Sequence, residues 1–582
     1  MVQSTLRGDE LELAERISYT KSMDPIEKLS PDYLAAKTPG DLEADEDGAL
    51  REGGALVYTS PEILAFLFQY AILGVVIGGT NSIGYPFLTA YYQLPPNILN
   101  SAGTLMTLGW SLKVFFGMLT DCVPIFGYRR KPYILGGWTV TAILLVYVAL
   151  RPAGAGAPDP AATHNGSSLA LVCTVVCFAM IIADVAQDAL TVSYSQLEPE
   201  AVRGRLVSLV YAVRGFAAAL VTNVSGFCLN SSRFGGHYDW DIGLNTFFWI
   251  LAVPVVLNLP IVYFFLQDDK STRVNFRKYI LELWDLLQLR VVWQVLLFNF
   301  LFNTFTGIGS TAGGYVKLYW AKVENLNSTV MYTVGKLLYI GMLVTVGKIG
   351  THWNWRAVIV WTTLLTNVID AAVMFSTIFD VVRNQWFFLG VPIAEMIPNA
   401  MNSMVSMFVI AELAGTGNEG VMFGLVTTVM NLPGLFTSII TNVINVPFRI
   451  STTRIKADTP DIRADVAWTY VIGYSLTLLG CFFVYLLPHQ KAAVAELKRT
   501  GGRYPRVAAF LFFAFMTILS VSITGTLMSM YDATSCTILA GGQGCDEPAP
   551  LWYLLGILLP AALSLIGIGV ATVVSRRTSA AE

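Results

Sequence analysis

Fourteen stretches of this chain are apolar over about the 20 residues that a helix needs to cross a lipid bilayer. Only helices and closed barrels can span a bilayer, because every backbone polar group must find its partner inside the protein. Charged residues form 13% of the 582 residues, whereas soluble domains carry about a quarter. These features predict an all-α polytopic membrane protein. The apolar runs lie near residues 62–90, 98–119, 132–150, 168–194, 206–228, 243–266, 291–316, 329–347, 357–379, 386–411, 420–447, 466–488, 506–530 and 551–574.

The order of these runs predicts a bundle of six plus six helices, followed by two additional C-terminal transmembrane helices. A charged stretch, QDDKSTRVNFRKYI, separates the first six runs from the next six. The N-terminal segment is polar and acidic, a composition typical of disorder. We therefore expect a disordered acidic cytoplasmic tail (1–57), an N-terminal six-helix half (58–266), a cytoplasmic linker (267–290), a C-terminal six-helix half (291–490), and a cytoplasmic loop, two-helix hairpin and short tail (491–582).

The distribution of lysine and arginine in the loops predicts the orientation. Bases concentrate in alternate loops, and cytoplasmic loops are the ones that carry an excess of Lys and Arg. The loop at 448–465 is an exception, because it places four bases on the opposite side, although three aspartates lie among them. We therefore expect both termini in the cytoplasm, and we place the protein in the plasma membrane.

Two further features agree with this orientation. The glycosylation sequons at Asn165, Asn230 and Asn327 all fall in loops that are predicted to be external. Cys536 and Cys545, a closely spaced pair in one loop, lie on the same side, where a disulfide could persist. We therefore expect three accessible sequons and one external disulfide.

A glycine pattern recurs at equivalent places in the two halves. The first run contains GVVIGG from Gly74, and the seventh contains GSTAGG from Gly309. Small residues at this spacing allow helices to pack closely. They equally allow a helix to bend or break, so that its backbone can face a substrate. Both interpretations remain open from the sequence.

Several ionisable residues lie inside the apolar runs, where each costs at least a few kcal/mol unless it has a partner or water. Lys113, Asp188 and Arg214 lie at similar depth, and Asp184 lies one turn deeper on the same face as Asp188. Two acids and two bases in one layer suggest a neutralised cluster. The cluster can be structural, or Arg214 or Lys113 can bind an anionic substrate while Asp184 or Asp188 exchanges a proton. The charged residues of a second-half alternative site are Lys336, Asp370 and Glu395.

The segment GMLTDCVPIFGYRRK, residues 117–131, concentrates charge between two apolar runs. Asp121, Gly127, Arg129 and Arg130 resemble the cytoplasmic loop between helices two and three of the major facilitator superfamily. A glycine permits the tight turn, and the bases keep it in the cytoplasm. Asp121 can pair with a base on a neighbouring helix in one state and release it in the other. Asp121, Arg129 and Arg130 are therefore predicted to act as a gate.

Three longer segments resemble the folate–biopterin transporter family more particularly. They are GWSLKVFFGMLTDCVPIFGYRRKPY, ADVAQDALTVSYSQLEPEAVRGRL and AELAGTGNEGVMFGLVTTVMNLPG, and the resemblance covers residues 65–490. It implies a twelve-helix facilitator fold that carries folates, pterins or related molecules with proton coupling. The helices after residue 505 and the second-half hinge, GKIGTHWNWR, depart from the family pattern. The matching charged positions are Lys113, Asp121, Arg129, Arg130, Asp184, Asp188, Arg214, Glu412 and Glu419.

The leading hypothesis is thus a secondary active transporter of folate- or pterin-like organic anions that works by alternating access. A facilitator-type transporter of a nucleoside, amino acid or sugar is the first alternative, and a transport-inactive receptor or scaffold is the second. A membrane enzyme is disfavoured, because no run carries a His/Asp or Ser/His constellation. We expect no cofactor, no metal site and no nucleic-acid partner.

Overall fold

The computed structural model describes residues 56–545, apart from residues 196, 199–204, 269, 271–275, 351–352, 414–418 and 543. Within these residues every regular element is a helix, and β structure is limited to isolated bridges. Most of the predicted tail and the fourteenth apolar run, 551–574, lie outside the described residues. The side chains of Asp121, Glu412 and Glu419 lie outside the description as well.

The first group of helices begins where the sequence offers a cap. Ser60 accepts a hydrogen bond from the backbone of Ile63, and Pro61 occupies the first turn, where its missing N–H costs nothing. The helices of this group are α5 (Pro61–Ser82), η1 (Gly84–Tyr91), α6 (Pro96–Thr107), η2 (Leu108–Leu112), α7 (Lys113–Cys122), α8 (Lys131–Leu150), α9 (Ala162–Ser195), α10 (Arg205–Cys228) and α11 (Gly243–Phe265).

The second group begins with a linker helix, and short segments join its members. Its elements are α12 (Phe276–Gln288), α13 (Arg290–Gly307), α14 (Gly313–Tyr315), η5 (Val316–Trp320), α15 (Asn325–Ile349), α16 (Trp355–Ile378), α17 (Gln385–Leu413), α18 (Glu419–Asn445), η6 (Val446–Phe448), α19 (Thr452–Ala457), α20 (Pro460–Gly480), η7 (Cys481–Leu486), α21 (Lys491–Thr500), α22 (Pro505–Ser529), α23 (Asp532–Ser535) and η8 (Ile538–Ala540).

Helices stand at thirteen of the predicted runs. Ten of the described helices are long and apolar enough to cross a membrane, and α13, α15 and α17 stand at three further runs. The chain is therefore an all-α polytopic membrane protein. The grouping into six plus six helices with two more remains a proposal.

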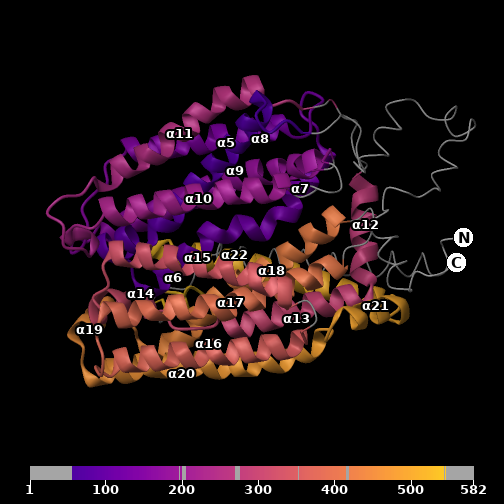
Figure 1. Ribbon diagram of the computed structural model, residues 1–582. Helices are drawn as coiled ribbons and strands as arrows, with labels where there is room; N and C mark the ends of the chain where they lie inside the picture. The colour runs from indigo at the N-terminus through magenta and orange to yellow at the C-terminus, as the bar shows by residue number, and fades with distance from the viewer. Residues whose placement is uncertain are drawn as a thin grey trace, which may run out of the picture.

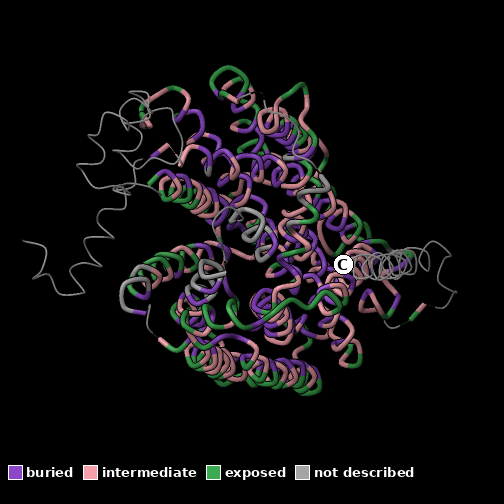
Figure 2. The backbone as a smooth tube through the Cα atoms, turned by 90° about the vertical axis from the view of Figure 1, so that its right-hand side faces the viewer, coloured by how far each residue is buried: buried purple, intermediate pink, exposed green. Residues whose placement is uncertain are grey.

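The helices lie roughly parallel in two groups, one above the other (Figure 1). We call α5–α11 the first half and α13–α20 the second half. Within the first half α10 packs on α5, and α8 packs on α9 and α11. The halves meet along two seams, α10 against α15 and α6 with α7 against α18, and α22 covers the second seam by packing on both α6 and α18. Figure 2 views this bundle from the end where α12 and α21 lie, which we call the α12 end; the opposite end, where α19 lies, is the α19 end.

The glycine pattern has a different role in each half. In α5, Gly74 and Gly78 lie against backbone carbonyls of α10 so closely that a Cβ atom would overlap them. This is close helix packing, and α5 continues unbroken through these glycines to Ser82. In the second half the helix does break, because α13 ends at Gly307 and α14 begins only at Gly313. Close packing is therefore found in the first half and a helix break in the second, whereas exposure of that backbone to a substrate stays a prediction.

Candidate functional site

The four charged residues predicted to share a layer form one cluster. The Nζ atom of Lys113 lies 2.6 Å from Asp184 and 2.8 Å from Asp188, so this one ammonium joins both aspartates. The Arg214 guanidinium lies 3.7 Å from the other oxygen of Asp184. The Asp184 side chain is completely buried, whereas those of Asp188 and Arg214 are 27% and 24% exposed. The cluster is neutral overall and has one buried and one accessible carboxylate.

Hydrogen bonds and aromatic rings hold this cluster in place. The Tyr70 hydroxyl on α5 lies 3.1 Å from Asp188 and 2.7 Å from the hydroxyl of Thr191. The Arg214 guanidinium lies over the ring of Tyr211, one turn earlier on α10, with 4.5 Å between them. Asp188 is therefore contacted from two other helices, α5 and α7, and Arg214 lies over an aromatic face.

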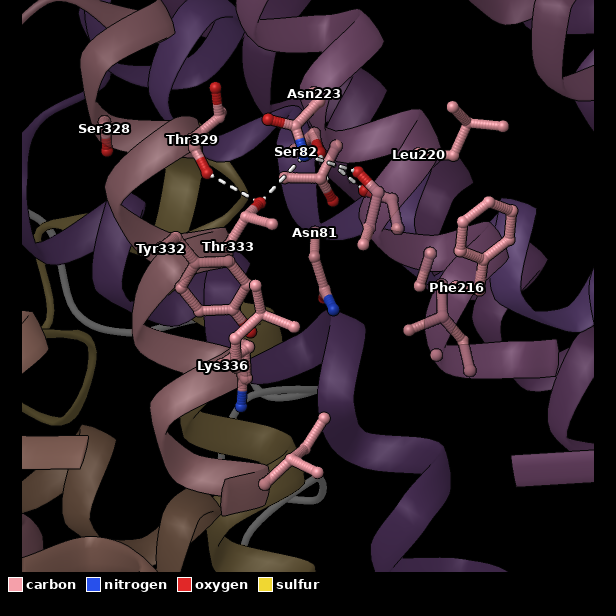
Figure 3. Close-up of a pocket in the computed structure, with 18 of the residues that line it drawn as sticks. Asn81, Ser82, Phe216, Leu220, Asn223, Ser328, Thr329, Tyr332, Thr333 and Lys336 are labelled. Carbon is pink, nitrogen blue, oxygen red and sulfur yellow. Dashed lines mark hydrogen bonds between the residues drawn. The ribbon is translucent and has the colours of Figure 1, made fainter. Parts of the chain in front are cut away.

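A cavity of about 980 Å³ lies beside this cluster, between the two halves. Its walls come from α5, α10, η5 and α15, and Tyr211 links it to the cluster because that ring both lines the cavity and lies under Arg214. Figure 3 shows Asn81 of α5 between the α15 side chains and those of α10. The polar and aromatic side chains that line it are Asn81, Ser82, Tyr85, Tyr211, Phe216, Thr222, Asn223, Lys317, Asn325, Ser328, Thr329, Tyr332, Thr333 and Lys336.

A hydrogen bond crosses this cavity from one half to the other. Asn223 of α10 donates to the hydroxyl of Thr333 on α15 at 2.8 Å, and Thr333 in turn donates to the carbonyl of Thr329 (Figure 3). Asn223 is part of an Asn-Val-Ser sequon, and its place inside a helix and inside this contact keeps it from the surface. A ligand in the cavity would therefore contact both halves at once.

Of the three charged residues predicted as a second-half alternative site, Lys336 lines the cavity and lies 5.2 Å from the ring centre of Tyr332. Asp370 on α16 accepts a 2.7 Å hydrogen bond from Tyr474 of α20. Glu395 lies on α17, close enough to Asp370 to interact with it electrostatically. No hydrogen bond or ion pair joins all three in the part of the chain that the structure describes, and the alternative site stays a prediction.

The predicted hinge is a tight turn whose basic residues bind within the first half. Gly127 adopts a φ of +84°, a conformation that glycine reaches without strain. The Arg130 guanidinium donates to the hydroxyl of Ser193 on α9 at 2.6 Å. The backbone N–H groups of Arg130 and Lys131 both donate to Asp268, which follows α11. This turn thus ties the start of α8 to α9 and α11.

The two halves are hydrogen-bonded to each other at the α19 end. The Asn325 amide donates to backbone carbonyls at the end of α10, at 3.2 Å and 3.1 Å. Lys456 of α19 donates to Gln93 of the first half at 2.7 Å, and Tyr315 donates to the carbonyl of Leu94. The cavity is therefore closed toward the α19 end in this conformation.

An arginine pair fixes the loop at 448–465 at this same end. Asp458 forms ion pairs with two arginines. Arg383, in the segment before α17, lies 2.5 Å from it, and Arg463 of α20 lies 2.8 Å from it. Hydrogen bonds from Arg383 and Arg463 lower the pKa of Asp458 to about 2. Within the loop, Arg463 pairs with Asp458 and Arg454 pairs with Asp465, so two of its four bases are neutralised locally.

One of the three sequons that were expected to be accessible is buried in the structure. Asn230 is completely buried, and its amide donates to Glu324 while its carbonyl oxygen accepts from the backbone of Leu326. A glycan could not be attached there in this conformation, because both polar atoms of the side chain join the two halves. Asn165 and Asn327 are only partly buried. Cys536 and Cys545 form a disulfide, as expected.

Sequence reasoning missed most of the cavity. It concentrated on ionisable residues, whereas much of the cavity's polar lining consists of uncharged side chains such as Asn81, Asn223 and Thr333. A signal was present, because an amide inside an apolar run is itself costly without a partner. Two such amides, Asn81 and Asn223, lie on separate helices and would have pointed to this region.

The comparisons with known proteins agree with this architecture. The chain matches the BT1 family over residues 80–506. It belongs to the BT1 family. The folate-biopterin transporter of Synechocystis sp. is 24% identical over 444 residues, which span 73% of this chain and 82% of that protein. The probable folate-biopterin transporter 5 of Arabidopsis thaliana is 25% identical and covers 63% of this chain and 73% of its own length.

A third relative, folate transporter 1 of Plasmodium falciparum, is 20% identical and covers 68% of this BT1-family chain and 74% of its own length. The relatives are named as transporters, so the resemblance inferred from the motifs is confirmed and the protein is a membrane transporter rather than an enzyme.

Solved structures share the fold. The crystal structure of a D-xylose–proton symporter has a TM-score of 0.51 at 15% identity, covering 73% of this chain and 97% of that chain. A variant of the nucleoside transporter NupG has a TM-score of 0.51 at 12% identity, covering 72% and 99%. At these identities the likeness concerns the fold alone, which this chain shares with both transporters.

Proposed function

We propose that this BT1-family protein carries folates, pterins or related organic anions across a membrane by alternating access, coupled to protons. The observation that carries this proposal is the cavity between the two halves, which combines aromatic walls, amide and hydroxyl groups and a basic residue. Binding sites for small molecules are mostly apolar clefts with a few placed polar groups. The naming of relatives from three organisms as folate or folate-biopterin transporters supports the substrate class.

The binding step uses the flat ring and the acidic groups of such a substrate. Tyr211 and Phe216 of α10 and Tyr332 of α15 offer aromatic surface on two sides of the cavity. Asn81 can donate and accept hydrogen bonds, as the edge of a pterin ring requires. Arg214 is partly exposed and has one loose acidic partner at 3.7 Å, so its planar fork can turn toward a carboxylate.

The coupling step uses the two aspartates of the cluster. Lys113 forms ion pairs with both of them. Protonation of Asp188 would therefore leave Lys113 paired with Asp184 only, and it would remove a negative charge near Arg214. Asp188 is the accessible member and can exchange a proton with water, whereas Asp184 is completely buried. A substrate anion at Arg214 and a proton at Asp188 would therefore favour each other.

Alternating access requires the two halves to separate at one end at a time. The hydrogen bonds between the halves at the α19 end support a conformation closed on that side. We place the α12 end and both termini in the cytoplasm, on the strength of the basic loops, and the disulfide on the outside. In this scheme the hinge residues Asp121, Arg129 and Arg130 stabilise one facing state, so Asp121→Asn should alter the exchange rate more than the binding affinity.

Uptake into proteoliposomes tests the proposal. The purified protein would be reconstituted with an outward-acidic pH gradient, and accumulation of labelled folate and biopterin would be compared with that of a nucleoside, an amino acid and a sugar. We expect accumulation of a folate or pterin that collapses when a protonophore removes the gradient. Accumulation of the nucleoside, amino acid or sugar alone would contradict the proposed substrate class. Uptake that does not depend on the pH gradient would contradict the proposed proton coupling.

A further inference from the structure

Two lysines line the cavity, and no acidic side chain accompanies them among its described lining residues. Lys317 comes from η5 and Lys336 from α15. Neither ammonium forms an ion pair within the portion of the chain covered by the structure. The neighbouring cluster of Lys113, Asp184, Asp188 and Arg214 is neutralised, so the cavity itself carries the uncompensated positive charge.

Each of these lysines is oriented by a neighbour that leaves it able to bind an anion. The Lys317 ammonium donates to the Ser328 hydroxyl at 2.5 Å and lies 4.5 Å from the ring centre of Tyr85. The Lys336 ammonium lies 5.2 Å and 5.3 Å from the ring centres of Tyr332 and Tyr339. A hydroxyl and three aromatic faces satisfy part of what water would give an ammonium, but none of them neutralises its charge.

The spacing of the two ammonium groups follows from the helix that separates them. Ser328 and Lys336 are eight residues apart on α15, and Tyr332 lies between them on the same face. Since Lys317 is bonded to Ser328, its ammonium lies at the level of Ser328, and the backbone of Lys336 follows about 12 Å further along the axis of α15 at 1.5 Å per residue. A charge-assisted bond of about 2.8 Å at each ammonium would leave a short gap between two bound acidic groups.

We propose that Lys317 and Lys336 form two anion subsites of one site, which selects ligands that carry two acidic groups on a short chain. This inference rests on the proposed function and narrows its substrate class. Two carboxylates on one glutamate residue can span such a gap, so the site favours a pterin joined to a glutamate over a free pterin. Low-dielectric walls concentrate the field of both lysines on the same region, which strengthens the preference for a dianion.

Binding measurements on the full chain in nanodiscs test this inference. Five probes differ in acidic groups: folate has two carboxylates, pteroate one and biopterin none, while p-aminobenzoyl-glutamate and p-aminobenzoate repeat the two-to-one comparison without a pterin ring. We expect folate to bind about tenfold more tightly than pteroate, as the loss of one charge-assisted contact would give. Lys317→Gln should bring folate down to the affinity of pteroate and leave pteroate nearly unchanged, whereas Lys317→Arg should retain the difference.

The control is Lys322→Gln, which removes an exposed lysine five residues along the chain that does not line the cavity. Thermal unfolding of each variant shows whether it is folded. Equal affinity of wild-type protein for folate and pteroate, or an unchanged ratio in Lys317→Gln, would overturn the two-subsite inference while the proposed function stands. If the wild type binds neither folate nor biopterin, the proposed function falls. The inference is then decided by whether p-aminobenzoyl-glutamate binds more tightly than p-aminobenzoate and loses that advantage in Lys317→Gln.

Discussion

Lys113 Nζ lies 2.6 Å from a carboxylate oxygen of Asp184, a side chain that no solvent reaches. The two residues come from different helices, α7 and α9, and a buried charge of either sign is costly unless the other is present. The same ammonium also holds Asp188, 2.8 Å away, at the accessible edge of the cluster. A structural contact and the proposed proton-exchange site are therefore joined through one lysine.

Removal of Lys113 should destabilise the fold strongly. In Lys113→Met the buried Asp184 loses its closest partner, and breaking a buried pair in this way costs about 3–5 kcal/mol. Adding Asp184→Asn should restore much of the stability, because the unpaired charge is then gone. Thermal unfolding in detergent would measure both variants, with Lys322→Met as the exposed control. Equal melting temperatures for Lys113→Met and the control would show that the pair does not hold the helices together.

Arg214→Ala and Asp188→Asn should separate binding from coupling. If a substrate carboxylate binds Arg214 rather than Lys317 or Lys336, Arg214→Ala should bind folate at least tenfold more weakly, which corresponds to about 1.4 kcal/mol. Asp188→Asn keeps the hydrogen-bonding shape but cannot gain or lose a proton, so it should still bind folate and should fail to accumulate it along a pH gradient. Equilibrium binding and proteoliposome uptake give the two readouts. If both variants keep normal folate binding and normal pH-driven accumulation, the functional site does not lie at this cluster.

The helices and the charged cluster could be predicted from the sequence, for physical reasons. A span of the bilayer fixes the length of each apolar run, and residues four apart on a helix share a face, which places Asp184 and Asp188 together. The cost of burying charge implied that two acids and two bases at one depth would meet. The pairing of Lys113 with both aspartates required only that α7 and α9 be neighbours.

The cavity and its second lysine could not be predicted, because they depend on how the halves meet. Lys317 lies just beyond the end of an apolar run and resembles an ordinary flanking base, yet the break in α13–α14 brings it against Ser328 of α15. Asn230 is a sequon by its local sequence, and only the contact with Glu324 and Leu326 across the seam buries it. Neither relationship is visible within one helix.

The stability that Asp458 gives to the loop at the α19 end should depend on pH only in strong acid. Arg383 and Arg463 lower the pKa of Asp458 from 3.8 to about 2. A carboxyl group with a lowered pKa stabilises the folded state fully above its unfolded pKa, and that contribution is lost as the pH falls through the folded pKa. Asp458→Asn should therefore lower the melting temperature equally at pH 7 and pH 5, with a difference that shrinks below about pH 4 and vanishes only below about pH 2.

The matched control for this loop is Asp461→Asn, in the exposed first turn of α20. It should leave the melting temperature nearly unchanged across the same pH range, since surface charges away from an ion pair contribute little. If Asp458→Asn is as harmless as Asp461→Asn at pH 7, the two arginines do not stabilise this end of the protein.

The last long helix that the structure describes, α22, should act on stability rather than on substrate choice. α22 packs on α6 and α18, and the disulfide-closed loop after it reaches the same seam, where Asn97 donates to the carbonyl of Ala540 at 3.2 Å. The cavity lies instead at the seam of α10 and α15, and no residue of α22 is among its described lining residues.

Truncation after residue 503 would uncover apolar faces of two helices that belong to different halves. We expect it to lower the melting temperature and the amount of folded protein, while the ranking of folate, pteroate and biopterin stays the same. The double variant Cys536→Ser with Cys545→Ser, which keeps α22 and opens the loop, should show a smaller loss. A truncated protein that is equally abundant but ranks the three ligands differently would instead assign α22 to the substrate pathway.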